Sequence, residues 1–526
     1  MSIQPVLIDG EWTQSSGTGT FHAVNPATRE PLPDAFPVSP WDEVERFIRA
    51  AHAASLEMAG WPGDRFAAFL DAYASAIESR AEQLVETAHF ETALPVSPRL
   101  KDVELPRTTG QLRQAASAAR DGSWAAPTID TAANIRSVYG PIGPVAVFGP
   151  NNFPFAFNGI AGGDFAAAIA AGNPVIAKGH SSHPATTRLF AEAVQEAIAA
   201  TEMPPALVQL IYRTSHSDGE KLVGHRLIGA TGYTGARSAG LVLKQAADQV
   251  GKPIYLELSS INPVFVLPGA LDERLEDLAE EYSGSCLMGA GQFCTNPGLV
   301  VLRDGPKTQQ FVDTVAAKFE QAPVGTLLSG GVEQNFATGI GALVEAGAEV
   351  VAGGQTGGGA GFSHQNTLLR VSGETFLKNA AALQSEAFGN GSLFVTAGSD
   401  DELIEIAGCL DGNLTGTVYS DTTGKDDALY SRVAPLIRRA VGRLINDKMP
   451  TGVAVSPAMN HGGPFPSTGH PAFTAVGIPA SIHRYAMLQC FDNVRADRLP
   501  PALQDANPTG TMWRFIDGNW TQGNVG

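Results

Sequence analysis

The sequence predicts an α/β protein with two parallel-sheet units and a small additional β element. Short apolar strands alternate with helices of 10–15 residues from Gly143 to Leu258, which is the pattern of βαβ units. A second series of strands begins at Pro263 and includes residues 393–396. The 526 residues, 44% of them hydrophobic, suffice for two or three domains with large cores.

The elements follow in order along the chain. Residues 6–12 hold an Asp-Gly turn between apolar residues, which predicts a β-hairpin, and residues 516–522 repeat the pattern. Apolar periodicity predicts helices over 41–59, 64–94 and 98–118. In the first α/β unit we predict strands at 144–150, 174–178, 207–212 and 253–258, and helices at 165–171, 186–200 and 237–247. Residues 353–361 and the tail after Ile482 have the composition of loops.

Composition limits the function classes. The net charge of −18 argues against a general nucleic-acid binder and against anionic membrane surfaces. Only 17% of the residues are charged, so we expect much surface to be hidden inside the fold or in an oligomer. The four cysteines have no metal-ligand spacing and form no disulfide framework, and no apolar run is long enough to span a bilayer. We expect a cytoplasmic protein without a metal.

Cys294 lies in a turn of small residues between an apolar stretch and a strand-like run. A thiol at such a junction is accessible to substrate, and its thiolate is a strong nucleophile. A buried structural cysteine is the commoner outcome for an isolated residue. A cysteine hydrolase is another reading, and it would need a histidine nearby in space.

Several polar residues end predicted strands. Glu257 lies in an apolar strand, where a carboxyl suits general-base chemistry. Asn152 follows the first strand of the parallel unit and can donate to an oxyanion, although an asparagine in a turn needs no such role. Lys178 ends a buried strand, the place where ligands bind in open parallel sheets.

Two further patterns suggest a nucleotide site. Gly235 and Gly240 flank the start of a helix that follows a strand, and helix N-termini favour phosphate. Glu386, followed by Phe388, can accept hydrogen bonds from ribose hydroxyls. His180 and His183 have an HxxH spacing, but no third ligand lies nearby in the sequence, so a metal there is disfavoured.

Taken together, these motifs resemble the aldehyde dehydrogenase superfamily. The resemblance covers nearly the whole chain. It rests on Ile8–Trp12, Asn25–Thr28, Asn152–Pro154, Ala171–Pro174 with Lys178, Tyr233–Gly235, Glu257–Leu258, Gly291–Cys294 and Glu386–Gly389.

The resemblance implies a fold and roles. Residues 1–120 with 141–256 would form a Rossmann-like dinucleotide-binding domain, 257–455 a catalytic domain, and 121–140 with 470–526 an oligomerisation element. Cys294 would be the nucleophile, Glu257 the general base and Asn152 the oxyanion donor. Lys178 and Glu386 would hold the riboses of the cofactor, Gly235 with the following helix its pyrophosphate, and Gly240 and Phe388 would also contact it.

Departures from the common family pattern point to one branch and to a cofactor. Ser259 and Ser260 follow the base, and Asn390 follows Gly389, as in α-ketoglutaric semialdehyde dehydrogenases and the NADP-linked long-chain aldehyde dehydrogenase of luminous bacteria. Ser181 stands where NAD-preferring relatives often carry an acid. Without that acid a 2′-phosphate is tolerated, and Arg213 can pair with it. We therefore expect NADP to be preferred, with NAD also used.

The expected reaction is oxidation of an aldehyde to a carboxylic acid through a Cys294 thiohemiacetal and thioester, with α-ketoglutaric semialdehyde (2,5-dioxopentanoate) giving 2-oxoglutarate. Alternatives are long-chain aliphatic aldehydes, a CoA-acylating semialdehyde dehydrogenase, a cofactor-independent cysteine esterase and a non-catalytic scaffold. Phe155, Phe157, Phe293 and Ser467 are candidate substrate contacts, and Arg113 is a candidate cation for a substrate acid. We expect a homodimer or homotetramer, with contacts through residues 135–139 and the C-terminal hairpin.

Overall fold

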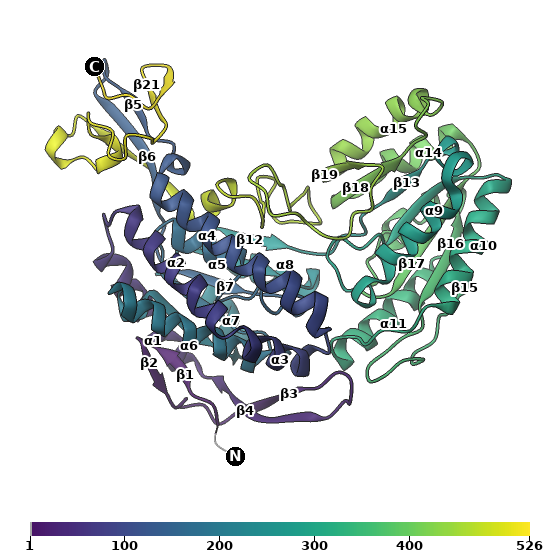
Figure 1. The fold of residues 1–526 in the computed structure, drawn as a ribbon, viewed down its shortest axis with the longest axis horizontal. Coiled ribbons are helices and arrows are strands. Elements are labelled where there is room, and N and C mark those ends of the chain that lie inside the picture. Colours follow the sequence, from purple (N-terminus) through teal and green to yellow (C-terminus); the bar gives the residue numbers. More distant parts are fainter. Residues whose placement is uncertain (1–2) are drawn as a thin grey trace.

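The computed structural model describes residues 3–526, which form four β-sheets. Figure 1 shows the two seven-stranded sheets as separate halves of the molecule, each covered by helices. A five-stranded sheet projects from one end beside the C-terminus. Most strands of the two large sheets run parallel, so the predicted α/β class is confirmed.

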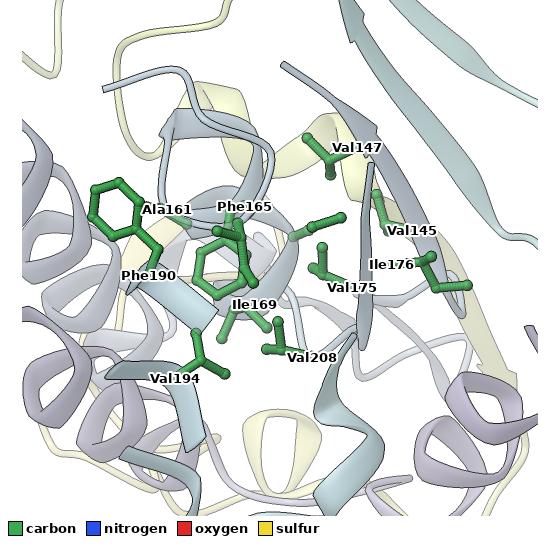
Figure 2. Close-up of a cluster of buried hydrophobic side chains, with 14 of the residues drawn as sticks. Val145, Val147, Ala161, Phe165, Ile169, Val175, Ile176, Phe190, Val194 and Val208 are labelled. Carbon is green, nitrogen blue, oxygen red and sulfur yellow. The ribbon is translucent and has the colours of Figure 1, made fainter. Parts of the chain in front are cut away.

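The first large sheet has five parallel strands and an antiparallel hairpin at one edge. Across the sheet the strands are β12 (Ile254–Glu257), β11 (Ala230–Thr234), β7 (Val145–Phe148), β8 (Val175–Lys178), β9 (Val208–Ile211), β1 (Val6–Ile8) and β2 (Glu11–Thr13). The helices in this half are α1 (Trp41–Glu57), α2 (Gly63–Ser79), α3 (Ala81–Thr92), α4 (Leu105–Asp121), α5 (Gly163–Ala170), α6 (Pro184–Thr201), α7 (His216–Val223) and α8 (Arg237–Asp248). β7 is apolar throughout because helices cover both faces of the sheet. Figure 2 shows the core of this half, where Phe165 and Ile169 of α5 lie between the strand valines and Phe190 of α6.

The second large sheet has one antiparallel edge strand and is otherwise parallel. Across the sheet the strands are β15 (Glu349–Ala352), β16 (Thr367–Ser372), β17 (Gly391–Ala397), β14 (Leu299–Arg303), β13 (Val264–Val266), β18 (Asn413–Tyr419) and β19 (Val441–Asn446). Its helices are α9 (Pro268–Leu287), α10 (Pro306–Gln321), α11 (Gly330–Glu345), α12 (Gly373–Lys378), α13 (Ala380–Leu383), α14 (Asp400–Gly408) and α15 (Asp427–Ala440). In Figure 1 the segment after β19 crosses back towards the first half.

Two smaller sheets complete the fold. The three-stranded sheet pairs β3 (Thr20–Val24), β4 (Pro31–Ser39) and β10 (Arg213–Thr214). The five-stranded sheet has the order β20 (Ala486–Asp492), β6 (Ile135–Pro141), β5 (Thr128–Asp130), β21 (Arg514–Ile516) and β22 (Asn519–Thr521). Both predicted Asp-Gly hairpins are present, as β1–β2 and β21–β22, and both turn residues have positive φ in each.

Three predictions of local structure were wrong. The helix expected over 64–94 is broken at Arg80, whose guanidinium pairs with Glu196 of α6. The helix expected over 98–118 is preceded by a π-helical turn, Val96–Glu104, and α4 runs from Leu105 to Asp121. The tail after Ile482 contains three strands, because β20 pairs with the distant β6 and β21 with β5. Such long-range pairing leaves no mark on local composition.

Candidate active site

The nucleophile candidate lies in a turn that only small residues can form. Gly289, Ala290 and Gly291 all have positive φ, and Cys294 follows them in the loop before β14. A Cβ at Gly291 would lie 2.0 Å from the carbonyl oxygen of Gly389. The Cys294 turn therefore packs directly on the Glu386–Gly389 segment, so two motifs that are distant in the sequence meet here.

Glu257 and Cys294 converge on one imidazole. The Nε2 atom of His461 lies 2.9 Å from Glu257 Oε1 and 3.4 Å from Cys294 Sγ. Glu257 and His461 are buried, and Cys294 is partly accessible. The structure thus brings together the thiol and the carboxyl that the sequence placed thirty-seven residues apart.

The charge distribution decides where the proton lies. Burial is the main cause that raises the pKa of the Cys294 thiol, and the Glu257 charge raises it further, while the charge of Arg107 lowers it. Nε2 is the His461 atom that contacts both groups, so it either donates a proton to Glu257 or accepts the proton of the Cys294 thiol. Cys294 is a neutral thiol in the resting site. Glu257 Oε2 is buried without a hydrogen-bond partner, so it is free for a water molecule or substrate.

His461 is the residue that the sequence reasoning missed. It lies in the segment after β19, 167 residues from Cys294. Its backbone N–H donates to Thr474 Oγ1, and its carbonyl accepts from the Ala475 N–H. A single histidine in a Gly- and Pro-rich loop carries no local signal. Only the fold of the 447–485 segment over the site reveals it.

Asn152 borders the Cys294 turn. Its Nδ2 donates to the carbonyl oxygen of Gln292 at 3.0 Å, and its own carbonyl oxygen accepts from Arg99. One amide hydrogen is thereby used for positioning, and the second remains to be donated.

One of the three phenylalanines that were expected to contact the substrate lies elsewhere. Phe155 does not line the site: it is fully buried in the first core, edge-on to Phe190. Phe153, two residues earlier, belongs to a separate apolar cluster with Phe157 and Phe293. Phe153 packs edge-on against Phe157 and Phe293, with ring centroids 5.2 and 5.6 Å apart.

Two polar residues that were expected to contact the substrate have other contacts in the structure. The Ser467 hydroxyl donates to the Pro464 carbonyl, and the Ser467 carbonyl accepts from the Leu258 N–H. This residue therefore fixes the chain beside Glu257. Arg113 forms an exposed ion pair with Glu78 on the surface, so it is not a cation of the substrate site.

The expected cofactor residues lie along one edge of the first sheet and across to the second. Lys178 ends β8, and its pKa is lowered to about 8 by burial and by the charge of Arg213. Gly235 precedes α8, and its N–H donates to the Glu257 carbonyl. Burial raises the pKa of Glu386 to about 7. Glu386, Phe388 and Phe293 line one cavity with Ser260.

The fit of a dinucleotide rests on groups without partners. The Thr234 hydroxyl is buried without a hydrogen-bond partner, directly before Gly235. The N-terminus of α8 has no side-chain cap, so its N–H groups suit a pyrophosphate. A Cβ at Gly240 would meet Leu258 at 2.5 Å, so this glycine allows α8 to pack closely, and a cofactor contact for it stays a prediction.

Among residues 3–526, one group brings three metal-ligating side chains close together: Glu257, Cys294 and His461, with ligand atoms within 4.8 Å of one another. His180 and His183 stack on each other without a third ligand in that part of the chain, and the His183 ring contacts the Pro150 carbonyl. The expected absence of a metal stays a prediction. Within the same residues, no helix is long and apolar enough to cross a membrane.

A thiol, an imidazole and a carboxyl between two α/β units are typical of an enzyme with a cysteine nucleophile. The family model for the aldehyde dehydrogenase family matches residues 12–464. The chain is 39% identical to α-ketoglutaric semialdehyde dehydrogenase 2 of Azospirillum brasilense, covering 97% of this chain and 98% of that one. It is 36% identical to α-ketoglutaric semialdehyde dehydrogenase of Acinetobacter baylyi, covering 96% of each. The structure of an aldehyde dehydrogenase of Bacillus cereus with NAD⁺ has the same fold, with a TM-score of 0.79 at 19% identity over 93% of this chain and 96% of that one.

The chain belongs to the aldehyde dehydrogenase family. It is an oxidoreductase that acts on a small-molecule aldehyde and uses NAD(P).

Proposed function

We propose that the enzyme oxidises α-ketoglutaric semialdehyde to 2-oxoglutarate, with Cys294 as the nucleophile and Glu257 as the general base. The observation that carries the chemistry is the contact of one imidazole nitrogen with both the thiol and the carboxyl. The substrate is supported by the names of two relatives that share 39% and 36% of their residues with nearly the whole chain.

The reaction begins at the Cys294 thiol. Because its pKa is raised, a base must take the proton as sulfur attacks the aldehyde carbon. The Glu257–His461 pair lies within reach of that proton. The second amide hydrogen of Asn152 and the backbone N–H of Cys294 would donate to the developing oxyanion. One such donor is typically worth about 10²–10³ in rate.

Oxidation of the thiohemiacetal on Cys294 to a thioester needs a hydride acceptor, and bound NAD(P)⁺ would supply it. Lys178 and Glu386 would hold its riboses, and Gly235 with the N-terminus of α8 its pyrophosphate. Phe388 lines the cavity that Glu386 shares with Phe293.

Hydrolysis of the thioester then needs an activated water. The unpartnered Oε2 of Glu257 can accept a proton from a water molecule beside the thioester carbon. Water attacks, the carbon–sulfur bond breaks, the carboxylic acid leaves, and Cys294 takes up a proton. A CoA-acylating enzyme would not need this carboxyl, and its presence favours hydrolysis.

NADP is the preferred cofactor in this proposal. Lys178 and Arg213 lie near enough for the charge of Arg213 to lower the pKa of Lys178. Ser181 is neutral. Two cations without an acid suit the 2′-phosphate of NADP.

Residues 1–120 with 141–256 are proposed as the dinucleotide-binding domain, 257–455 as the catalytic domain, and 121–140 with 470–526 as the oligomerisation element. β20 lies at the edge of its sheet and exposes Met487 and Leu488. An unpaired edge strand with apolar side chains favours pairing with a second copy. We propose a homodimer or homotetramer in a reducing, cytoplasmic setting.

One alternative gains support from a specific observation. A cysteine esterase needs a histidine beside the thiol, and His461 occupies that position. Ester hydrolysis without a cofactor would then accompany the main activity.

Initial rates test the proposal. α-Ketoglutaric semialdehyde, succinic semialdehyde and a long-chain aldehyde are each assayed with NAD and with NADP, without CoA. The proposal expects the highest kcat/KM for α-ketoglutaric semialdehyde with NADP. A higher kcat/KM for the long-chain aldehyde contradicts the substrate, and turnover of esters alone contradicts the dehydrogenase assignment.

A further inference from the structure

Arg107 is a partly buried cation without an ion-pair partner. It lies in the first turn of α4, and its Nε and Nη2 atoms are enclosed without a hydrogen-bond partner. Among residues 3–526, no carboxylate lies within ion-pair distance of it. Arg99, eight residues earlier, differs: it pairs with Glu104 and donates to the Asn152 carbonyl.

The neighbouring carboxylate makes its hydrogen bonds to other groups. Glu104 Oε1 accepts from the backbone N–H groups of Phe155 and Ala156, and Oε2 accepts from Arg99. The charge of Glu104 acts on Arg107 from a distance, without a hydrogen bond between them. Enclosed guanidinium donors without a partner are costly, so they indicate a missing anion.

Arg107 faces the reaction centre across aromatic rings. Its guanidinium carbon lies 5.2 Å from the ring centre of Phe157 and 5.7 Å from that of Phe153. Phe153 in turn packs on Phe293, which precedes Cys294. The charges of Arg107 and Cys294 affect each other, which places both groups in the same enclosed region.

A second arginine near Cys294 is already occupied. Arg443 of β19 donates to the carbonyl oxygen of Pro450 and contacts that of Gly452. It holds the segment that carries His461. Arg99 and Arg443 each keep one enclosed Nε without a partner, whereas Arg107 has both Nε and Nη2 left for a ligand.

We propose that Arg107 binds the carboxylate at the far end of the substrate, so that the enzyme selects short ω-oxo carboxylic acids over neutral aldehydes. The planar guanidinium binds a carboxylate through two parallel hydrogen bonds. The rings of Phe153 and Phe157 hold the guanidinium by cation–π contact and exclude water from it. A long aliphatic aldehyde would leave the charge uncompensated. This inference rests on the proposed dehydrogenase function.

The test compares two aldehydes that differ only in the carboxylate, 5-oxopentanoate and pentanal. We expect wild-type enzyme to prefer the acid. In Arg107→Met the ratio of the two kcat/KM values should fall about 30–100-fold, because a hydrogen-bonded charge pair is lost. Arg107→Lys should retain part of the preference. Arg113→Met, on the same helix but in a surface ion pair, should leave the ratio unchanged.

The proposal is overturned if Arg107→Met leaves the ratio of the two kcat/KM values unchanged. An equal loss of kcat/KM for both aldehydes would mean that Arg107 acts only on the Cys294 thiol. Arg107→Met should not lower the melting temperature, because the variant removes a cation that has no ion-pair partner. If Arg107→Met does not fold, an acid preference that is partly retained in Arg107→Lys and absent in Arg107→Gln supports the proposal, and an equal preference in both contradicts it.

A binding assay separates this proposal from the proposed function. Glutarate should slow alkylation of Cys294 by iodoacetamide in wild type and not in Arg107→Met, and this needs neither cofactor nor turnover. Protection without aldehyde oxidation would contradict the dehydrogenase function and support the anion site. Oxidation of aldehydes without protection by glutarate would support the dehydrogenase function and contradict the anion site at Arg107.

Discussion

The proposed reaction centre and the Lys178 region differ in the charges that their side chains bring together. At the reaction centre the chain supplies complementary groups: a carboxylate, an imidazole and a thiol contact one another. At Lys178 two cations repel each other, and burial and Arg213 lower the pKa of Lys178 to about 8. The first region combines an anion with proton donors of its own chain, whereas the second holds two cations that an anionic ligand would balance.

This difference separates residues that react from residues that bind. A self-complementary cluster holds protons in place and passes them between its members. An uncompensated cluster gains free energy when an anion arrives. Arg107 belongs to the second kind although it lies beside the first, which is why we assign it to binding and not to proton transfer.

Loss of the nucleophile is the strongest way to test the reaction centre. Cys294→Ala should lower kcat by at least about 10⁴-fold, because both covalent steps need the sulfur. NADP binding, measured by fluorescence titration, should stay within about threefold, since the Lys178 region is untouched. Residual dehydrogenase turnover above one per cent would show that Cys294 is not the nucleophile.

Removal of the base should split the reaction into its two halves. Glu257→Gln should give a burst of NADPH close to one per site and then a steady rate about 10²–10³-fold lower, because thioester hydrolysis lacks its base. The Glu257 charge raises the pKa of Cys294. Its loss lowers that pKa, so alkylation of Cys294 by iodoacetamide at pH 7 should become faster. Unchanged steady-state turnover would exclude Glu257 as the base.

His461 links the two groups, and a pair of variants distinguishes positioning from proton transfer. His461→Ala should lower kcat about 10–100-fold. His461→Gln keeps a donor towards Glu257 but cannot take the thiol proton. If the imidazole assists deprotonation, kcat of His461→Gln rises with pH beyond the wild-type plateau, because the raised pKa of Cys294 must then be reached by solvent pH alone. Full rescue by Gln with a wild-type pH profile would leave His461 as a positioning residue only.

The uncompensated region predicts a different response to pH. A bound 2′-phosphate favours charged Lys178, so NADP affinity should be strong below pH 8 and fall as pH rises through the pKa of about 8. NAD affinity should depend less on pH. Arg213→Ala should weaken NADP about tenfold and NAD less than twofold. Equal losses for both cofactors would remove Arg213 from the phosphate site.

The sequence could predict the site residues that lie in recognisable local patterns. Cys294, Glu257, Lys178 and Gly235 lie at strand ends or in small-residue turns, and these local patterns carry information about position. The alternation of strands and helices likewise predicted the parallel sheets. Family resemblance supplied the remaining roles.

The sequence could not reveal groups whose significance comes from the fold. His461 matters because the fold brings it into contact with Cys294, although the two residues are 167 positions apart in the sequence. Arg107 matters because its neighbour Glu104 is already bonded to Arg99 and to two backbone N–H groups. Phe155 and Phe153 are two residues apart in one motif, and only the fold decides which packs with Phe157 and Phe293. β20 becomes a strand through its pairing with β6.

The smallest expected effect concerns the projecting sheet. Both charge clusters consist of residues of one chain, so separating the subunits should leave both intact. Leu488→Asp puts a charge on an exposed edge strand and should shift the oligomer towards smaller species, as measured by sedimentation. We expect kcat and the KM for NADP to change by less than about twofold, and Glu45→Ala in α1 is a control at a surface away from this sheet. A large loss of activity on dissociation would mean that a partner subunit completes one cluster, and the contrast between a self-sufficient centre and a ligand-dependent one would then no longer hold for a single chain.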